Sequence, residues 1–271
     1  MGAARRERLD VVLVRRGLFQ SRREAQAAIL AGRVTVAGRR VDKPGTAVAA
    51  DAPVDVSGPA HPYASRGGLK LAAALDRFGL DPRDWAVIDV GASTGGFTDV
   101  WLRRGARRVV AVDVGRGQLL PRLAADPRVV VRDQTNARWL TLADVGGEPA
   151  DAASVDVSFI GLQLVVPAVV ACLRPGGHLL ALVKPQFEVG RGRVGKGGVV
   201  RRPEDHVEVL ARLVAAAGAW GVGVEGVMPS PVRGAEGNRE FFLWGRRGTA
   251  GRPVDVHSAV AEAWAQGGQD A

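Results

Sequence analysis

The stretch that decides the fold is IDVGASTGGFTD, residues 88–99. An apolar run at 85–90 leads into a turn that contains three glycines, and apolar residues at helical spacing follow from Phe97 onward. This order predicts a buried strand, a tight turn and a helix, because glycine allows backbone conformations and close ligand approach that other residues do not. Such a turn is typical of nucleotide-like cofactor sites, and a purely structural turn is the alternative.

The glycine spacing distinguishes between cofactors. A dinucleotide site would show G-x-G-x-x-G, whereas these glycines follow G-x-x-x-G-G. The next apolar run, 107–115, contains Asp113, where an acid at a strand tip can accept hydrogen bonds from ribose hydroxyls. These features favour S-adenosylmethionine. The candidate cofactor contacts are Gly91, Ala92, Ser93, Thr94, Gly95, Gly96, Phe97 and Asp113, with Asp133 and Asn136 as further candidates for the adenine edge or as an ordinary loop turn.

Strand patterns alternate with helix patterns along most of the chain. This alternation predicts an α/β fold, a doubly wound, mostly parallel, Rossmann-like sheet of seven strands, with the last strand inserted antiparallel. We expect strands at 85–90, 108–113, 128–131, 152–157, 178–183, 221–228 and 239–244. We expect helices at 69–78, 96–104, 162–173 and 203–218.

Positive charge is concentrated at the start of this 271-residue chain. Residues 1–60 contain 11 Lys or Arg and six Asp or Glu, while the remaining residues carry only +4 of the net +9. This asymmetry favours a module that binds a polyanion, because neutralising phosphates releases counterions. A well-solvated, arginine-rich surface is the alternative.

The first sixty residues also show a recognisable order of elements. Helical spacing at 8–17 is followed by a second helix that Ser21 would cap and by a hairpin of 34–36 and 39–41. The run RLDVVLVRRGLFQSRREAQAAILAGRVTVAGRRV resembles S4-like RNA-binding domains over 8–56, which implies recognition of structured RNA by shape and backbone. We interpret Arg8-Leu9-Asp10, at the beginning of this run, as part of the first helix and not as a catalytic motif. The candidate RNA contacts are Arg8, Arg15, Arg16, Ser21, Arg22, Arg23, Arg33, Arg39, Arg40 and Arg66.

A stretch rich in small residues and proline separates this module from the rest. We expect an S4-like domain at 1–58, a linker at 59–65 and an α/β domain at 66–271. Cys172 lies in an apolar run and is expected in the core. The chain shows neither a signal segment nor an apolar span of membrane length, so we expect a cytoplasmic protein without membrane contacts. We also expect a monomer, because no exposed apolar heptad is evident, and we expect no metal site.

Lysine is rare in this chain, since only four of its 37 basic residues are lysine. A lysine retained among arginines can serve where a proton must be released, which arginine cannot do, although chance is the alternative. Lys70 and Lys184 are candidates for a coupled pair, because Lys70 follows S-R-G-G and Lys184 ends an apolar strand. Asp156 also ends an apolar strand, where an unpaired charge is costly.

Several segments together resemble one enzyme family. The segments YASRGGLKL, IDVGASTGGFTD, VAVDVG, RDQTN, VDVSFI, LVKPQFE and GNREFFLW resemble FtsJ-type ribose methyltransferases, and the order of the two modules resembles the TlyA, or hemolysin A-like, rRNA methyltransferases. The resemblance implies S-adenosylmethionine as the methyl donor. It implies cytidine 2'-O-methylation in small-subunit rRNA, and for some members also in large-subunit rRNA. It also implies a catalytic tetrad of Lys70, Asp156, Lys184 and Glu240.

A ribose hydroxyl is a weak acid, so methyl transfer to it needs alignment and help with the proton. We expect Lys184 to act as the base, with Lys70 assisting and the two carboxylates orienting the lysines. A non-catalytic rRNA-binding or ribosome-assembly protein, a hemolysin and a base methyltransferase are the alternatives. The hemolysin is disfavoured because Pro167 interrupts the longest apolar run, and the base methyltransferase because the chain lacks an N-P-P-Y motif and a catalytic cysteine candidate.

Overall fold

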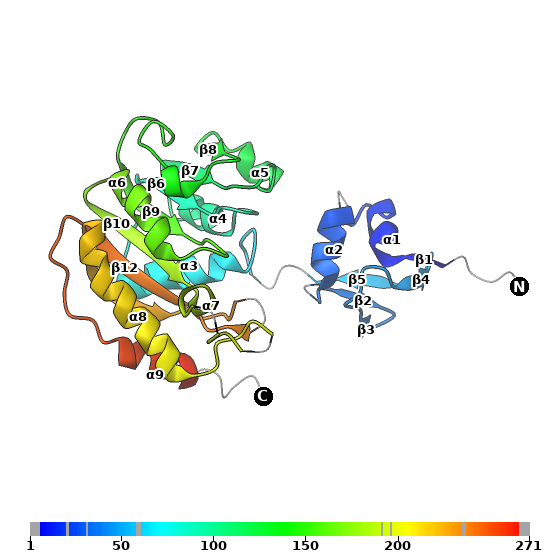
Figure 1. Cartoon of the computed structure of the whole chain (residues 1–271). Coiled ribbons are helices and arrows are strands. Elements are labelled where there is room, and N and C mark those ends of the chain that lie inside the picture. Colours follow the sequence, from blue (N-terminus) through cyan, green and yellow to red (C-terminus); the bar gives the residue numbers. More distant parts are fainter. Residues whose placement is uncertain are drawn as a thin grey trace, which may run out of the picture. The chain divides into compact units, whose positions relative to one another are not determined.

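The computed structural model describes two compact units, within Met1–Pro62 and Tyr63–Ala271 (Figure 1). The described residues are 6–19, 22–30, 32–57, 61–190, 192–195, 197–234 and 237–265, without the side chain of Glu24. Each unit has its own apolar core, so the two are described separately.

The larger unit contains a seven-stranded sheet in the order β11-β12-β10-β9-β6-β7-β8. The strands are parallel except β12, which lies antiparallel between β10 and β11. The predicted seven-stranded, mostly parallel sheet and its antiparallel last strand are therefore confirmed. The strand bounds are β6 Ala86–Val90, β7 Arg108–Val112, β8 Val129–Arg132, β9 Ala150–Val155, β10 Leu173–Val183, β11 Val222–Pro229 and β12 Phe241–Arg247.

Helices cover both faces of this sheet (Figure 1). One face packs against α3 (Gly67–Phe78), α4 (Gly96–Arg103) and α5 (Pro121–Ala124). The other face packs against α6 (Val166–Ala171), α8 (Pro203–Ala217) and α9 (Val256–Ala265), while α7 (Pro185–Glu188) follows β10. Three short 3₁₀ turns complete the described unit: η1 (Ala137–Trp139), η2 (Leu162–Leu164) and η3 (Gly218–Trp220).

The helix expected at 162–173 was wrong in extent. Only η2 and the short α6 occupy this region, and Leu173 already pairs with Ala150 as the first residue of β10. The hydrophobicity of this valine-rich run fits a helix or a strand equally well. Its last residue, Leu173, belongs to the strand. Helix α9 was not expected at all. Within the described residues, no helix is long and apolar enough to cross a membrane.

The smaller unit contains the expected helix pair and hairpin. Its elements are β1 (Arg6–Arg8), α1 (Leu9–Arg15), α2 (Arg22–Leu30), β2 (Val34–Val36), β3 (Arg39–Arg40), β4 (Ala47–Ala49) and β5 (Val54–Val56). Arg8 ends a strand that pairs with β4 and does not begin the first helix as predicted. The strands β1, β4 and β5 were missed because three residues are too few to show alternation. The strand β2 is equally short, but the turn at 37–38 indicated its hairpin with β3. Ser21 and its predicted cap lie outside the described residues.

A buried aspartate joins three elements beneath the glycine turn. Asp89 of β6 accepts hydrogen bonds from Thr98 Oγ1 of α4 at 2.7 Å and from Ser154 Oγ of β9 at 2.8 Å. Ser154 in turn accepts a hydrogen bond from Trp101 Nε1 of α4 at 2.9 Å. All four side chains are 0% exposed. This network fixes the start of α4 to two neighbouring strands.

Burial has a measurable consequence for Asp89. Desolvation raises its pKa to about 6, although hydrogen bonds from Thr98 and Ser154 oppose the rise. The unfolded value is about 3.9, so the native state binds this proton more tightly than the unfolded chain does. The contribution of protonated Asp89 to stability is therefore full below about pH 4 and is lost as the pH rises through about 6.

We predict that Asp89→Asn removes this pH-dependent loss. Between pH 4 and 8, the free energy of unfolding of the wild type should fall by about 2 kcal/mol relative to the variant. Urea titrations followed by tryptophan fluorescence test this on the larger unit, because all six tryptophans lie within it. Exposed Glu148→Gln controls for loss of a carboxylate. Parallel stability curves for wild type and Asp89→Asn would contradict the prediction.

Candidate active site

A cavity of about 190 Å³ lies at the carboxyl end of β6. The glycine turn forms one side of it, and the beginning of α3 forms another. Two candidate catalytic side chains, Lys70 and Asp156, also reach it. The lining residues are Ser65, Gly67, Lys70, Gly91, Ala92, Ser93, Thr94, Gly96, Phe97 and Asp156.

The turn lies directly against the end of the neighbouring strand β9. Gly91 has a φ of 81°, and a Cβ on it would lie 2.2 Å from the carbonyl oxygen of Asp156. The amide of Asp156 also donates a hydrogen bond to the carbonyl of Val90 at 2.8 Å. A side chain at Gly91 would therefore force the turn away from Asp156.

A second close approach brings α3 to the turn. A Cβ on Gly96 would lie 2.2 Å from Ser65 Oγ and 3.1 Å from the amide nitrogen of Gly68. Because α3 begins at this contact, Lys70 in its first turns reaches the cavity. Ser65 and Gly67 were not predicted as lining residues, although the S-R-G-G segment before Lys70 marks their position.

Lys70 forms a buried ion pair with Glu240. Its Nζ lies 2.5 Å from Glu240 Oε2, and the two side chains are only 11% and 2% exposed. Glu240 directly precedes β12, the antiparallel strand. The pair therefore joins residues that are 170 positions apart in the chain.

Lys184 forms a second ion pair at the ends of two parallel strands. Lys184 follows β10 and Asp156 follows β9, and Lys184 Nζ lies 2.5 Å from Asp156 Oδ1. Lys184 also donates a hydrogen bond to Ser158 Oγ at 3.0 Å. Their side chains are 12% and 21% exposed, so solvent still reaches this pair.

Electrostatics connects the two pairs. Burial raises the pKa of Glu240 above its usual range; Lys70 and Lys184 oppose the rise and Asp156 reinforces it. The structure thus brings the four predicted tetrad residues into one group with two positive and two negative charges. Such a group keeps buried charges compensated while offering two ammonium groups for binding and proton transfer.

Asp113, expected at the cofactor ribose, and Asp133 and Asn136, expected at the adenine edge, follow the neighbouring strands β7 and β8. Asp113 accepts hydrogen bonds from the amides of Ser93 at 2.8 Å and Gly115 at 2.7 Å. Asp133 accepts one from Gly117, and Asn136 caps the short helix η1 through the amide of Arg138. None of the three lines the cavity formed by the described residues. They fix the loops beside the turn.

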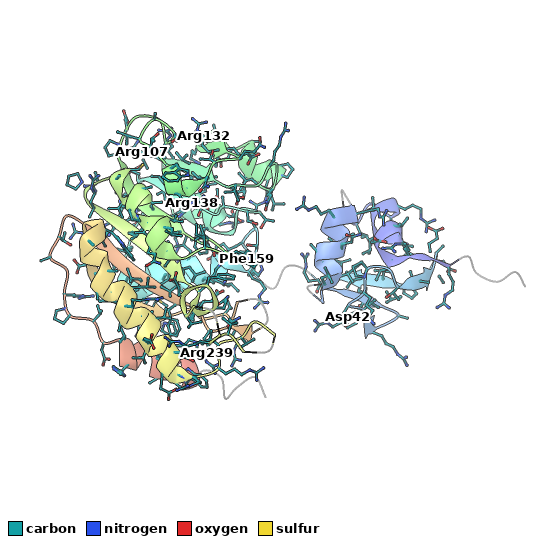
Figure 2. The ribbon with its side chains drawn as sticks, viewed as in Figure 1. Asp42, Arg107, Arg132, Arg138, Phe159 and Arg239 are labelled. Carbon is teal, nitrogen blue, oxygen red and sulfur yellow. The ribbon has the colours of Figure 1, made fainter. Side chains whose placement is uncertain are left out.

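An exposed aromatic residue lies near Lys184 and was missed by sequence reasoning. Phe159 directly follows Ser158 and is 90% exposed, with a positive φ of 62° (Figure 2). Its ring lies 4.9 Å from that of Phe187, which lies in α7. A single phenylalanine in a loop gives no periodic signal, so only the structure reveals its exposure.

The predicted RNA contacts of the smaller unit differ in their surroundings. Arg16 donates to the carbonyls of Ala50 and Ala52, and Arg33 donates to the carbonyl of Ser57. These bonds stabilise the unit itself. Arg8 and Arg22 share one buried carboxylate, and the remaining described candidates of this unit are exposed, namely Arg15, Arg23, Arg39 and Arg40. Arg66 belongs to the larger unit and is exposed.

Comparisons with known proteins agree with the division into two units. Residues 63–247 match the model of FtsJ-like methyltransferases, and residues 7–54 match the S4 domain. The chain is 45% identical to the 16S/23S rRNA (cytidine-2'-O)-methyltransferase TlyA of Mycobacterium tuberculosis, over 96% of this chain and 99% of that one. It is 46% identical to YqxC of Bacillus subtilis, provisionally named an rRNA methyltransferase, over 96% and 95% of the two chains.

A solved structure extends the similarity to three dimensions. A protein of Streptococcus thermophilus, provisionally named a hemolysin, is 41% identical and superposes with a TM-score of 0.78 over 99% of both chains. The match thus includes both units and the residues around the cavity. The chain belongs to the TlyA family of FtsJ-like methyltransferases that carry an S4 domain.

Proposed function

We propose that this protein transfers the methyl group of S-adenosylmethionine to the ribose 2'-hydroxyl of a cytidine in ribosomal RNA. The observation that carries the proposal is the group of two lysines and two carboxylates beside the cavity at the glycine turn. The similarity to a relative named a 16S/23S rRNA (cytidine-2'-O)-methyltransferase supports ribosomal RNA as the substrate. We propose small-subunit rRNA as the main substrate and large-subunit rRNA as a further one.

The cavity and the loops beside it together suit the proposed cofactor. Helix α4 begins after Gly95 without a side-chain cap, and its first residues, Gly96 and Phe97, line the cavity. Free amides at a helix start attract a carboxylate such as that of the amino-acid part. Asp113 would hold the ribose hydroxyls, and Asp133 with Asn136 would border the adenine. When bound, S-adenosylmethionine supplies an electrophilic methyl group.

The tetrad residues then act on the ribose hydroxyl. Lys184 sits at the more exposed pair and is held by Asp156 and Ser158. Its ammonium group would first release a proton to solvent, and the neutral amine would then accept the proton of the ribose hydroxyl as the methyl group is transferred. Lys70, whose position Glu240 fixes, would bind the hydroxyl or its neighbouring phosphate. Pairing each lysine with a carboxylate sets its direction before substrate arrives, which lowers the entropic cost of alignment.

The function is tested by transfer from tritiated S-adenosylmethionine to separately purified 30S and 50S subunits from cells lacking the gene. Mapping 2'-O-methyl groups in rRNA from cells with and without the gene identifies the nucleotide. Label on a cytidine ribose is expected. Label on a base, or none on either subunit, would refute the proposal.

We predict that Lys184→Arg lowers the methyl-transfer rate at least ~100-fold. Arginine preserves the charge but does not release its proton, so it cannot act as the base. The affinity for S-adenosylmethionine, measured by calorimetry, should stay within about twofold of the wild type, because positive charge is retained. Lys43→Arg, at an exposed turn of the smaller unit, is the matched control. Full activity of Lys184→Arg would exclude Lys184 as the base.

We predict that Asp113→Ala weakens S-adenosylmethionine binding about 30-fold. The loss of a charged hydrogen-bond acceptor is worth about 2 kcal/mol, and the amides of Ser93 and Gly115 also lose their partner. Calorimetry measures the effect, and thermal unfolding checks that the fold is intact. Asp81→Ala, an exposed acid paired with Arg83, should bind normally. Unchanged affinity of Asp113→Ala would remove Asp113 from the cofactor site.

A further inference from the structure

One buried carboxylate in the smaller unit, on α1, accepts side-chain hydrogen bonds from the strand β1 and the helix α2. Asp10 of α1 is 0% exposed. Arg8 donates to both of its oxygens, from Nε to Oδ1 and from Nη2 to Oδ2, each at 3.0 Å. Arg22 Nη2 donates to Oδ2 at 3.0 Å, and Gln26 Nε2 donates to the same oxygen at 2.7 Å.

The charges of this cluster do not cancel. The hydrogen bonds from Arg8, and then those from Gln26 and Arg22, hold the pKa of Asp10 far below its usual range, so the carboxylate is ionised. One arginine would neutralise it, but two guanidinium groups are present. The cluster therefore carries a net positive charge, and its cations face solvent, since Arg8 is 52% and Arg22 55% exposed.

The geometry suits one small anion. Arg8 Nη2 and Arg22 Nη2 each lie 3.0 Å from Oδ2 of Asp10, so they can be at most twice that distance apart. A guanidinium group has five N–H donors, and the contacts to Asp10 leave some of them on each arginine. Two guanidinium groups this close can both donate to the oxygens of one phosphate.

We propose that Arg8 and Arg22 form a single binding site for one backbone phosphate of the RNA, and that Asp10 is the positioning residue that sets them side by side. The inference rests on the proposed function in that RNA is the substrate. It goes further by joining two separate arginines into one site and by giving a buried acid a role in binding a polyanion.

The test exploits the sign of the charge change. Asp10→Asn and Asp42→Asn each remove one negative charge from the smaller unit, and Asp42 is exposed (Figure 2). If charge alone mattered, both variants would bind RNA as well as the wild type or better. If Asp10 positions the arginines, Asp10→Asn should bind about tenfold more weakly despite its additional positive charge, while Asp42→Asn does not.

The measurement uses the full chain and 30S and 50S subunits from cells lacking the gene, with filter binding at several salt concentrations. In steady-state transfer, Asp10→Asn should raise KM for subunits and leave kcat and the affinity for S-adenosylmethionine unchanged. Circular dichroism and thermal unfolding check its fold. If folded Asp10→Asn binds as tightly as Asp42→Asn, the inference is overturned.

A double-mutant cycle of Arg8→Ala and Arg22→Ala gives a second test that leaves Asp10 in place. For one shared phosphate, the two effects on the dissociation constant should be strongly non-additive. The magnitude of the slope of log binding constant against log salt concentration should decrease by about one when both arginines are replaced. Additive effects, with a fall of about one for each arginine, would overturn the inference, even if Asp10→Asn does not fold.

The outcomes separate the inference from the proposed function. A wild-type protein that binds subunits without transferring methyl groups would refute the function, while the binding comparisons would still decide the role of Asp10. An active enzyme in which Asp10→Asn binds like Asp42→Asn would refute only the inference.

Discussion

The buried hydrogen bonds of Asp89 are the interaction on which the larger unit depends. Its carboxylate binds hydroxyls from α4 and β9 while its own backbone lies in β6, so three elements meet at one charge. Leaving this carboxylate without partners would cost more than the bonds themselves contribute, which makes the arrangement specific. The glycine turn lies in the chain between Asp89 and Thr98, so the hydrogen bond between these two residues joins the elements on either side of it. The cavity, which this turn lines, depends on that connection.

The order of the strands explains why the two halves of the candidate site meet. The chain runs from β6 to β7 and β8 on one side and returns through β9 and β10 on the other. A crevice opens at such a switch point, and ligands bind there in open α/β sheets. The turn after β6 and Asp156 after β9 lie on its two sides, in contact through Gly91. In the proposed function, cofactor and ribose would therefore meet at this crevice.

The two units use buried aspartates in opposite ways. Asp89 is bound by uncharged hydroxyls, and burial raises its pKa. Asp10 is bound by two arginines, which keep it ionised and leave the surface cationic. In the tetrad, by contrast, equal numbers of positive and negative charges compensate one another. The partner groups, not the aspartate itself, decide whether a buried carboxylate stabilises a core or presents charge.

The sequence by itself determined the fold class, the strand–turn–helix at 88–99 and the grouping of basic residues in the first sixty positions. These features are local, because hydrophobic period, glycine spacing and charge can be read within one segment. Residue patterns also indicated Lys70, Lys184 and Asp156, whereas Glu240 came only from family resemblance. Helix α9, the short strands and the true extent of α6 were not predicted from the sequence. The secondary structure of a short or ambiguous apolar run depends on the elements that pack against it. Only the tertiary structure decided which lysine pairs with which carboxylate and that Arg8 and Arg22 share Asp10, because these contacts join residues that packing, not sequence spacing, brings together.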